Sequence, residues 1–303
     1  MARAGSEVRS GGWRGLAPAP PMSEAQFARW VELVRRRTGM QLAPERKSFL
    51  ITSLAARMRE LGCEDYDAYY ALLTEGPRGA VEWALLVDRL TVHETRFFRH
   101  RPSFALIRER LLPQAPVPEA LQPYRLQVWS IGCATGEEAY SLAIAIDEHL
   151  SRIGGRYYFG ITATDISLSA LATARRGRYP GKRLDRVSPD QRARYFRRVA
   201  PDTWEVVPEL RKRVCFAQLN VLELARAPLA PMDLIFCQNV LIYFDRAQRE
   251  AVLVEVVRRL APGGMLVLGP GELVGWRHPE LERVHYPDTL AFRRVARAGG
   301  GAA

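Results

Sequence analysis

The stretch VWSIGCATGEEAYSLAIAI, Val128 to Ile146, decides the fold. It begins with apolar residues typical of a buried strand, passes through a turn bracketed by Gly132 and Gly136, and continues as an apolar-rich helical segment. A strand, a glycine turn and a helix in this order are the opening unit of a doubly wound parallel sheet, which binds ligands at the carboxyl ends of its strands. Unexpectedly for a phosphate site, two carboxylates, Glu137 and Glu138, begin the helix.

The sequence after Gln122 keeps alternating between strand and helix patterns, as this unit predicts. Strands are expected in YRLQVWSIG, YYFGITATD, MDLIFCQN and MLVLG, with APGG as a turn before the last of them. ERVHYPDTLAFRRV predicts two antiparallel strands around a Pro-Asp turn at the end of the sheet. The segment from Tyr179 to Gln218 interrupts the alternation, and its short strand candidates TWEVV and KRVCFAQ predict an inserted loop and hairpin.

The part of the chain before this sheet is helical in pattern. Ser23 and Gln26 form a capping-box sequence, and Gly39 is placed to end the helix that follows. Three more helical patterns follow, and four prolines mark the linker PQAPVPEALQP. We therefore expect a disordered tail over 1–21, a helical N-terminal domain over 22–112, a linker over 113–123 and an α/β domain over 124–303, with a basic β insertion at about 179–218.

The composition of the 303-residue chain limits its partners and its compartment. A formal net charge of +11 favours acidic partners, and the segment from Leu171 to Cys215 carries 13 Lys and Arg against 5 Asp and Glu. This segment is also explained by a basic face in contact with solvent alone. The four cysteines have neither paired spacing nor a nearby histidine, so no metal site or disulfide framework is indicated. No signal-peptide core or membrane-length apolar run occurs, and we expect a cytoplasmic protein.

The glycine turn indicates a ligand without phosphate. It lacks the G-x-G-x-x-G spacing of dinucleotide sites and the Lys-Ser/Thr of a P-loop. A helix N-terminus attracts phosphate, but Glu137 and Glu138 neutralise that field. A cationic ligand fits better, and S-adenosylmethionine has an α-ammonium, a sulfonium and a neutral adenosine.

Two further strand ends are predicted to open into the same crevice. Asp165, at the end of ITATD, is placed to accept hydrogen bonds from both ribose hydroxyls. Each acid also has a structural explanation, because Glu137 and Glu138 favour a helix start and Asp165 suits the cap of a helix near Ser167. The end of DLIFCQNVLIYF lacks the Asn/Asp-Pro-Pro-aromatic motif of enzymes that methylate exocyclic amines, so an amine of DNA or of glutamine is a poor candidate substrate.

Five stretches in this order resemble the CheR-type chemoreceptor glutamate O-methyltransferases: LTVHETRFFRHRPSF, VWSIGCATGEEAYSLA, ATDIS, LIFCQNVLIYFD and LAPGGMLVLG. The resemblance runs from about Ser23 to Val295. It implies a helical N-terminal domain, a Rossmann-like class I methyltransferase domain with a seven-stranded sheet, and a small β-subdomain. It also implies methyl transfer from S-adenosylmethionine to glutamates on cytoplasmic helices of chemoreceptors, giving glutamyl methyl esters.

The resemblance also implies a set of site residues. Those placed around the cofactor are His93, Thr95, Arg99, Gly132, Glu138, Asp165, Asn220, Val221, Gln238 and Asn239. Glu138 would take the α-ammonium and Asp165 the ribose diol. Arg99 would lie near the cofactor carboxylate or the incoming glutamate, and with Tyr243, beside the transfer pocket, it could orient the incoming carboxylate. Many relatives have Asn in place of His93 and Arg in place of Gln238. Because a glutamate with a reference pKa of about 4.3 is already ionised, no general base is required.

The resemblance further suggests how receptors are held. In some relatives the β-subdomain adds a strand to a peptide at the receptor's C-terminus, and Tyr195 to Gln218 occupies that place. Arg57 and Arg59 are candidates to face acidic receptor helices, or are solvated charges. Two alternatives remain: an enzyme that methylates RNA or DNA, prompted by the positive charge, and a silent binding module. The charged segment lacks an aromatic-basic stacking platform, so nucleic acid is not an expected partner.

Overall fold

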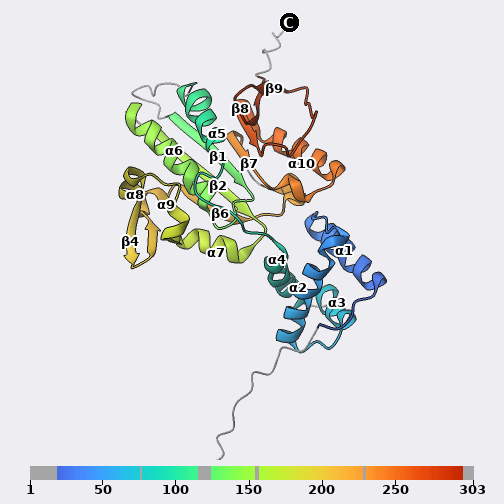
Figure 1. Ribbon diagram of the computed structural model, residues 1–303. Coiled ribbons are helices and arrows are strands. Elements are labelled where there is room, and N and C mark those ends of the chain that lie inside the picture. Colours follow the sequence, from blue (N-terminus) through green and yellow to red (C-terminus); the bar gives the residue numbers. More distant parts are fainter. Residues whose placement is uncertain (1–18, 76, 115–123, 154–156, 228–229, 296–303) are drawn as a thin grey trace, which may run out of the picture.

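The computed structural model describes residues 19–75, 77–114, 124–153, 157–227 and 230–295. Most of the predicted tail and of the predicted linker lies outside these residues. Figure 1 shows four helices, α1 to α4, gathered at one end of the molecule, with the sheet and its covering helices forming the rest. Among the helices that the structure describes, none is long and apolar enough to cross a bilayer.

The helices at this end are α1 (Glu24–Thr38), α2 (Lys47–Leu61), α3 (Tyr66–Thr74) and α4 (Gly79–Leu90), with a 3-10 turn η1 (Pro44–Arg46) before α2. The predicted capping box of Ser23 and Gln26 starts α1, and Gly39 ends it in the left-handed conformation. Trp30 is buried at the centre and stacks on Tyr69, with ring centroids 5.5 Å apart. These helices therefore have a hydrophobic core of their own.

The main sheet has seven strands in the order β6-β2-β1-β7-β8-β10-β9. Their bounds are β1 (Tyr124–Ile131), β2 (Tyr157–Asp165), β6 (Val214–Gln218), β7 (Met232–Cys237), β8 (Leu260–Leu268), β9 (Leu281–Val284) and β10 (Leu290–Arg294). The first five in spatial order are parallel, whereas β10 runs antiparallel to both β8 and β9. The predicted doubly wound sheet with an antiparallel pair at its end is therefore confirmed.

Two details of the strands differ from the sequence prediction. The segment KRVCFAQ was expected in the inserted hairpin, but its residues Val214–Gln218 form β6 and pair in parallel with β2. Val214 and Phe216 are buried against the main core, which explains the pairing. APGG was expected as a turn, but β8 begins at Leu260 and includes it. Gly263, at φ 76°, accommodates the irregular register there.

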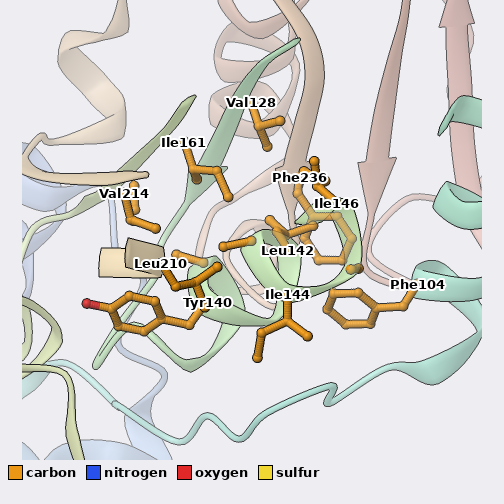
Figure 2. Packing of buried hydrophobic residues seen from close by; sticks show 14 of the residues in the cluster. Phe104, Val128, Tyr140, Leu142, Ile144, Ile146, Ile161, Leu210, Val214 and Phe236 are labelled. Atoms are coloured by element: carbon orange, nitrogen blue, oxygen red, sulfur yellow. The ribbon is translucent and has the colours of Figure 1, made fainter. Parts of the chain in front are cut away.

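Helices cover both faces of the sheet. They are α5 (Arg101–Leu106), α6 (Glu137–Ile153), α7 (Leu168–Arg176) and α10 (Arg246–Arg258), with a π turn η2 (Ile107–Leu111) and 3-10 turns η3 (Leu112–Gln114), η5 (Val221–Arg226) and η6 (Leu241–Tyr243). Val128 belongs to one buried cluster with Leu142 of α6 (Figure 2), whereas its neighbour Trp129 belongs to the cluster on the other face. Burial on both faces explains why the strand reads as nearly continuous apolar sequence.

The inserted β-subdomain lies between α7 and β6. It contains β3 (Arg178–Pro180), β4 (Phe196–Ala200) and β5 (Thr203–Val206) in the antiparallel order β3-β5-β4, together with η4 (Gly181–Leu184), α8 (Pro189–Tyr195) and α9 (Pro208–Arg211). Phe196 is buried, whereas the other residues of β4 are exposed. Because β4 stands at one end of the order β3-β5-β4, it is an edge strand of this small sheet.

Candidate active site

A cavity of about 340 Å³ lies at the carboxyl ends of β1, β2 and β7, the place where a sheet of this kind binds ligands. Every residue that the sequence assigned to the cofactor or to methyl transfer lines it: His93, Thr95, Arg99, Gly132, Glu138, Asp165, Asn220, Val221, Gln238, Asn239 and Tyr243. The structure thus brings together segments spread over about 150 residues of the sequence.

The glycine turn forms one wall of the cavity through its backbone. Gly132 and Gly136 have φ values of 71° and 95°, which favour glycine. A Cβ atom added to Gly132 would lie 2.3 Å from Cγ2 of Val240. The N–H groups of Gly132 and Cys133 both donate to the carbonyl of Thr164, which fastens the turn to the end of β2. At Gly132 the wall of the cavity is therefore formed by backbone, because there is no room for a side chain.

Glu138 presents its carboxyl group to the cavity and makes few interactions there that would stabilise its ionised form. Ser130 donates its hydroxyl proton to Oε1 over 2.7 Å. Burial raises the pKa of Glu138 to about 8; the Ser130 hydrogen bond and the nearby charge of Arg99 lower it, and Glu272 raises it further. A cation bound in the cavity would favour the ionised form, so Glu138 is suited to a ligand ammonium.

Asp165 lies at the end of β2 and is held by two backbone donors. The N–H of Ala134 donates to Oδ2 over 2.8 Å, and that of Ser167 donates to Oδ1 over 2.9 Å. Burial raises the pKa of this carboxyl, and the backbone hydrogen bonds and the charge of His93 oppose the rise. Two donors leave acceptor capacity on both oxygens, which is what a vicinal diol requires.

Glu137 has a different task from its neighbour. It is 1% exposed, and it accepts a hydrogen bond from Oγ1 of Thr135 and an ion-pair hydrogen bond from Arg183 at 3.0 Å. Arg183 also donates to the carbonyl of Thr95 over 2.8 Å. The explanation that Glu137 only favours the helix start is therefore incomplete, because it ties the β-subdomain and the segment around Thr95 to α6.

The segment HETRFFRH is fixed by its two phenylalanines. Phe97 and Phe98 are buried, and Phe97 packs edge-on against Tyr179 and Phe196 of the β-subdomain. This anchorage leaves Thr95 and Arg99 facing the cavity. Nη1 of Arg99 donates to the carbonyl of Glu94 over 2.7 Å, so the guanidinium is oriented from its own loop.

The polar side chains after β7 and β6 are already engaged with protein. Nε2 of Gln238 donates to Ser103 Oγ over 2.8 Å and to the Leu268 carbonyl over 3.0 Å, which leaves its carbonyl oxygen for a ligand. Asn220 donates to the carbonyl of Arg37 in α1 over 2.7 Å and accepts from the N–H of Leu222. Asn220 thus links the helical domain to the cavity wall.

One residue that holds the site, Glu272, was missed in the sequence. It is 2% exposed and accepts backbone N–H groups of Gly269, Val240 and Leu241 at 2.7 to 3.0 Å. It thereby fixes the turn in which Asn239 adopts a φ of 60°. An acid flanked by glycines directly after a predicted strand, in GPGELVG, was the signal available.

Residues of the helical domain other than His93, Thr95 and Arg99 also line the cavity, and the sequence did not predict these. Thr38 and Met40, from the end of α1 and the connection after it, line the cavity together with Thr91 at the end of α4. The ligand site therefore lies between the two parts of the chain.

Charges outside the cavity change two sequence interpretations. Arg57 is buried rather than facing outward, and its Nε donates to Glu82 over 2.8 Å. It therefore cannot face receptor helices in this structure. In the basic segment, the buried Glu205 pairs with three arginines, Arg178, Arg197 and Arg211, so part of that charge is used inside the protein.

Comparison with known proteins identifies the relatives of this arrangement. Residues 25–91 match the family described as "CheR methyltransferase, all-alpha domain", and residues 93–288 match "CheR methyltransferase, SAM binding domain". A chemotaxis protein methyltransferase of Klebsiella aerogenes is 35% identical over 85% of this chain and 86% of its own. Chemotaxis protein methyltransferase 1 of Pseudomonas aeruginosa is 33% identical over 89% and 98%, respectively. A probable biofilm formation methyltransferase of the same organism is 31% identical over 90% of this chain and 63% of its own.

Proposed function

The chain belongs to the CheR methyltransferase family, and on that premise we propose how its cavity performs the reaction: it holds S-adenosylmethionine between Glu138 and Asp165 and presents the methyl group to a glutamate side chain of a chemoreceptor. The observation that carries the proposal is the pair of half-buried carboxyl groups, Glu138 and Asp165, in one cavity, each with acceptor capacity left over. The product is a glutamyl methyl ester.

The residues of the cavity fit this cofactor. Glu138 has a hydroxyl partner and a raised pKa, so an α-ammonium would supply the positive charge that its ionised form lacks. Asp165 would accept the ribose hydroxyls, and the backbone wall at Gly132 admits a ligand close to the sheet. Gln238 would offer its carbonyl oxygen, and Asn220 would act chiefly by holding the wall beside Val221.

The chemical step needs little from the protein beyond placement. When bound, S-adenosylmethionine supplies an electrophilic methyl group, which leaves S-adenosylhomocysteine behind after transfer. The glutamate of the receptor is already a nucleophile at neutral pH, so the residues around it need only hold an oxygen in line with the methyl carbon and exclude water.

Arg99 and Tyr243 are placed to orient the incoming carboxylate. Both line the cavity, and Arg99 is held by the carbonyl of Glu94. An arginine that bound the carboxylate too strongly would stabilise the ground state and slow the attack. The carbonyl of Glu94 occupies Nη1, which leaves the remaining N–H groups of Arg99 for one oxygen of the substrate or for the carboxylate of the cofactor.

The β-subdomain is the proposed site of a receptor tether. Its edge strand β4 exposes Arg197, Arg198 and Val199, and an edge strand can accept a further strand from a peptide. Receptors whose C-terminal peptide is removed should then be methylated more slowly at low receptor concentration, and addition of the free peptide should inhibit the intact receptor. The reaction is proposed to take place in the cytoplasm, where the receptor helices lie.

Transfer of a tritiated methyl group tests the reaction. Purified enzyme, methyl-tritiated cofactor and receptor-containing membranes are incubated, and the labelled protein is then treated with alkali. We expect base-labile release of methanol, which identifies an ester. Base-stable label on an amide, or label on RNA, would contradict a glutamate substrate.

Two variants separate binding from transfer. Asp165→Ala should weaken cofactor binding by removing the acceptor for the ribose, whereas Tyr243→Phe should bind nearly normally and transfer more slowly. An enzyme that binds cofactor but methylates no receptor would favour the silent binding module. Equal loss of binding in both variants would contradict the assigned roles.

A further inference from the structure

One of the hydrogen-bond chains that join the helical domain to the cofactor site passes through the buried Ser167. We infer that Asp88 of α4 is a positioning residue for cofactor binding, acting through Ser167 on Asp165. The inference rests on the proposed function, since it takes Asp165 as the acceptor for the ribose.

Ser167 is the centre of this chain. It is 0% exposed, and its hydroxyl donates to Oδ1 of Asp88 over 2.6 Å. The same oxygen accepts the N–H of Ala170 over 3.1 Å as the N-cap of α7. The hydroxyl proton is therefore committed to Asp88, which fixes the side-chain rotamer and the turn that contains it.

The turn that contains Ser167 in turn holds the carboxyl group of Asp165. The N–H of Ser167 donates to Oδ1 of Asp165, and the N–H of Ala134 in the glycine turn donates to Oδ2. The carboxylate is thus held by two backbone donors, one from the turn after β1 and one from the turn after β2. If the Ser167 turn moves, Asp165 loses one of its two fixed donors and its orientation toward the ribose changes.

The position of Asp88 allows the helical domain to influence how Asp165 is held. Helix α4 packs against α7 and then leads into Thr91 and His93, which line the cavity. Because Asp88 belongs to one part of the chain and Ser167 to the other, docking of the two parts supports the orientation of the acceptor for the ribose.

A second contact between the two parts provides a matched control. Nε2 of Gln41 donates to Oδ2 of Asp245 over 3.1 Å in an exposed pair, and neither residue lines the cavity. Loss of this contact should weaken docking to a similar small degree without touching the two donors that hold Asp165.

The test compares Asp88→Ala, Asp88→Asn, Ser167→Ala and Gln41→Ala in the full chain. Cofactor affinity is measured by calorimetry, and kcat and KM are measured with receptor membranes. Asp88→Ala and Ser167→Ala should raise the Kd for S-adenosylmethionine about tenfold, as expected for losing a hydrogen bond to a charged group. The kcat at saturating cofactor and the KM for receptor should stay within about twofold of wild type. Asp88→Asn keeps an acceptor and should restore the affinity, and Gln41→Ala should leave it unchanged.

Several outcomes would overturn the inference. One is a folded Asp88→Ala or Ser167→Ala protein that binds cofactor as tightly as wild type. Another is an equal rise of Kd in Gln41→Ala, which would show a general effect of docking. If Asp88→Ala does not fold, Ser167→Ala decides, because it keeps the backbone donor and Asp88. Failure of the wild type itself to bind S-adenosylmethionine would instead refute the proposed function.

Discussion

Binding of S-adenosylmethionine should release a proton from Glu138. Burial raises the pKa of this carboxyl to about 8, so at pH 6.5 the free enzyme holds it almost entirely protonated. The cofactor's α-amino group, with a reference pKa of about 7.7–8.0, is charged at that pH and favours the carboxylate. The pKa of about 8 lies about 1.5 units above pH 6.5, so at about 1.36 kcal/mol per unit, ionising Glu138 at this pH costs about 2 kcal/mol. The affinity should therefore rise about tenfold from pH 6 to pH 7 and then level off, as Glu138 becomes ionised in the free enzyme and the α-amino group begins to lose its proton.

Calorimetry measures the release of this proton, because the binding enthalpy then depends on the ionisation enthalpy of the buffer. At pH 6.5 the wild type should release about one proton per cofactor, whereas Glu138→Gln should bind more weakly and release close to none. Near pH 9 binding should take up a proton instead of releasing one, because Glu138 is then ionised in the free enzyme and the free amino group of the cofactor has lost its proton. Tight wild-type binding at pH 6.5 without proton release would refute the argument. Equal release by Glu138→Gln would assign the proton to another acid, such as Asp165.

Buried charges also predict the stability of three variants. Because folding raises the pKa of Glu138, its contribution to stability is lost as pH rises from about 4.5 to about 8, and Glu138→Gln should melt above cofactor-free wild type at pH 8 but not at pH 5. The pKa of Glu205 is shifted in the opposite direction from that of Glu138. Burial raises it, but the arginines around Glu205, Arg197 foremost, lower it overall. Its ion pairs are thus present at neutral pH and lost in acid, so Glu205→Gln should speed hydrogen exchange in β4 and β5 at pH 7. Arg57→Ala should cost about 3–5 kcal/mol in denaturant unfolding, because it leaves Glu82 buried and unpaired; normal stability with slower receptor methylation would instead support a docking role.

Local signals account for the parts of the fold that the sequence predicted. The capping box at Ser23, the glycine stop at Gly39 and the Pro-Asp turn before β10 each depend on residues within a few positions of one another. The strand β6 was misplaced because its partner is β2, about 50 residues earlier, and no local turn marks that pairing. Membership of a sheet is a long-range property, whereas the beginning and end of a helix are not.

The same distinction explains the site. Parallel strands bring their carboxyl ends to one edge, so residues directly after β1, β2 and β7 could be placed in one cavity from the sequence. The partners Arg183 and Asp88 could not, because they come from segments whose docking is decided by packing. Glu272 differs, because it follows a predicted strand directly and its flanking glycines were a local signal. Arg57 shows the reverse error, since its charge indicated an exposed position and its buried partner Glu82 lies in another helix.

The two glutamates that open α6 divide two tasks because of helix geometry. Consecutive residues of a helix point about 100° apart, so Glu137 and Glu138 cannot face the same neighbour. Glu137 points to Arg183 and fixes the β-subdomain, whereas Glu138 points into the cavity with only Ser130 as a hydrogen-bond partner among the described residues. The positive field of the helix N-terminus is then met by one acid that is neutralised inside the protein and one that is not. An ammonium would favour the ionised form of Glu138 and complete a pairing of the kind that Glu137 already has, whereas a phosphate would oppose that ionisation.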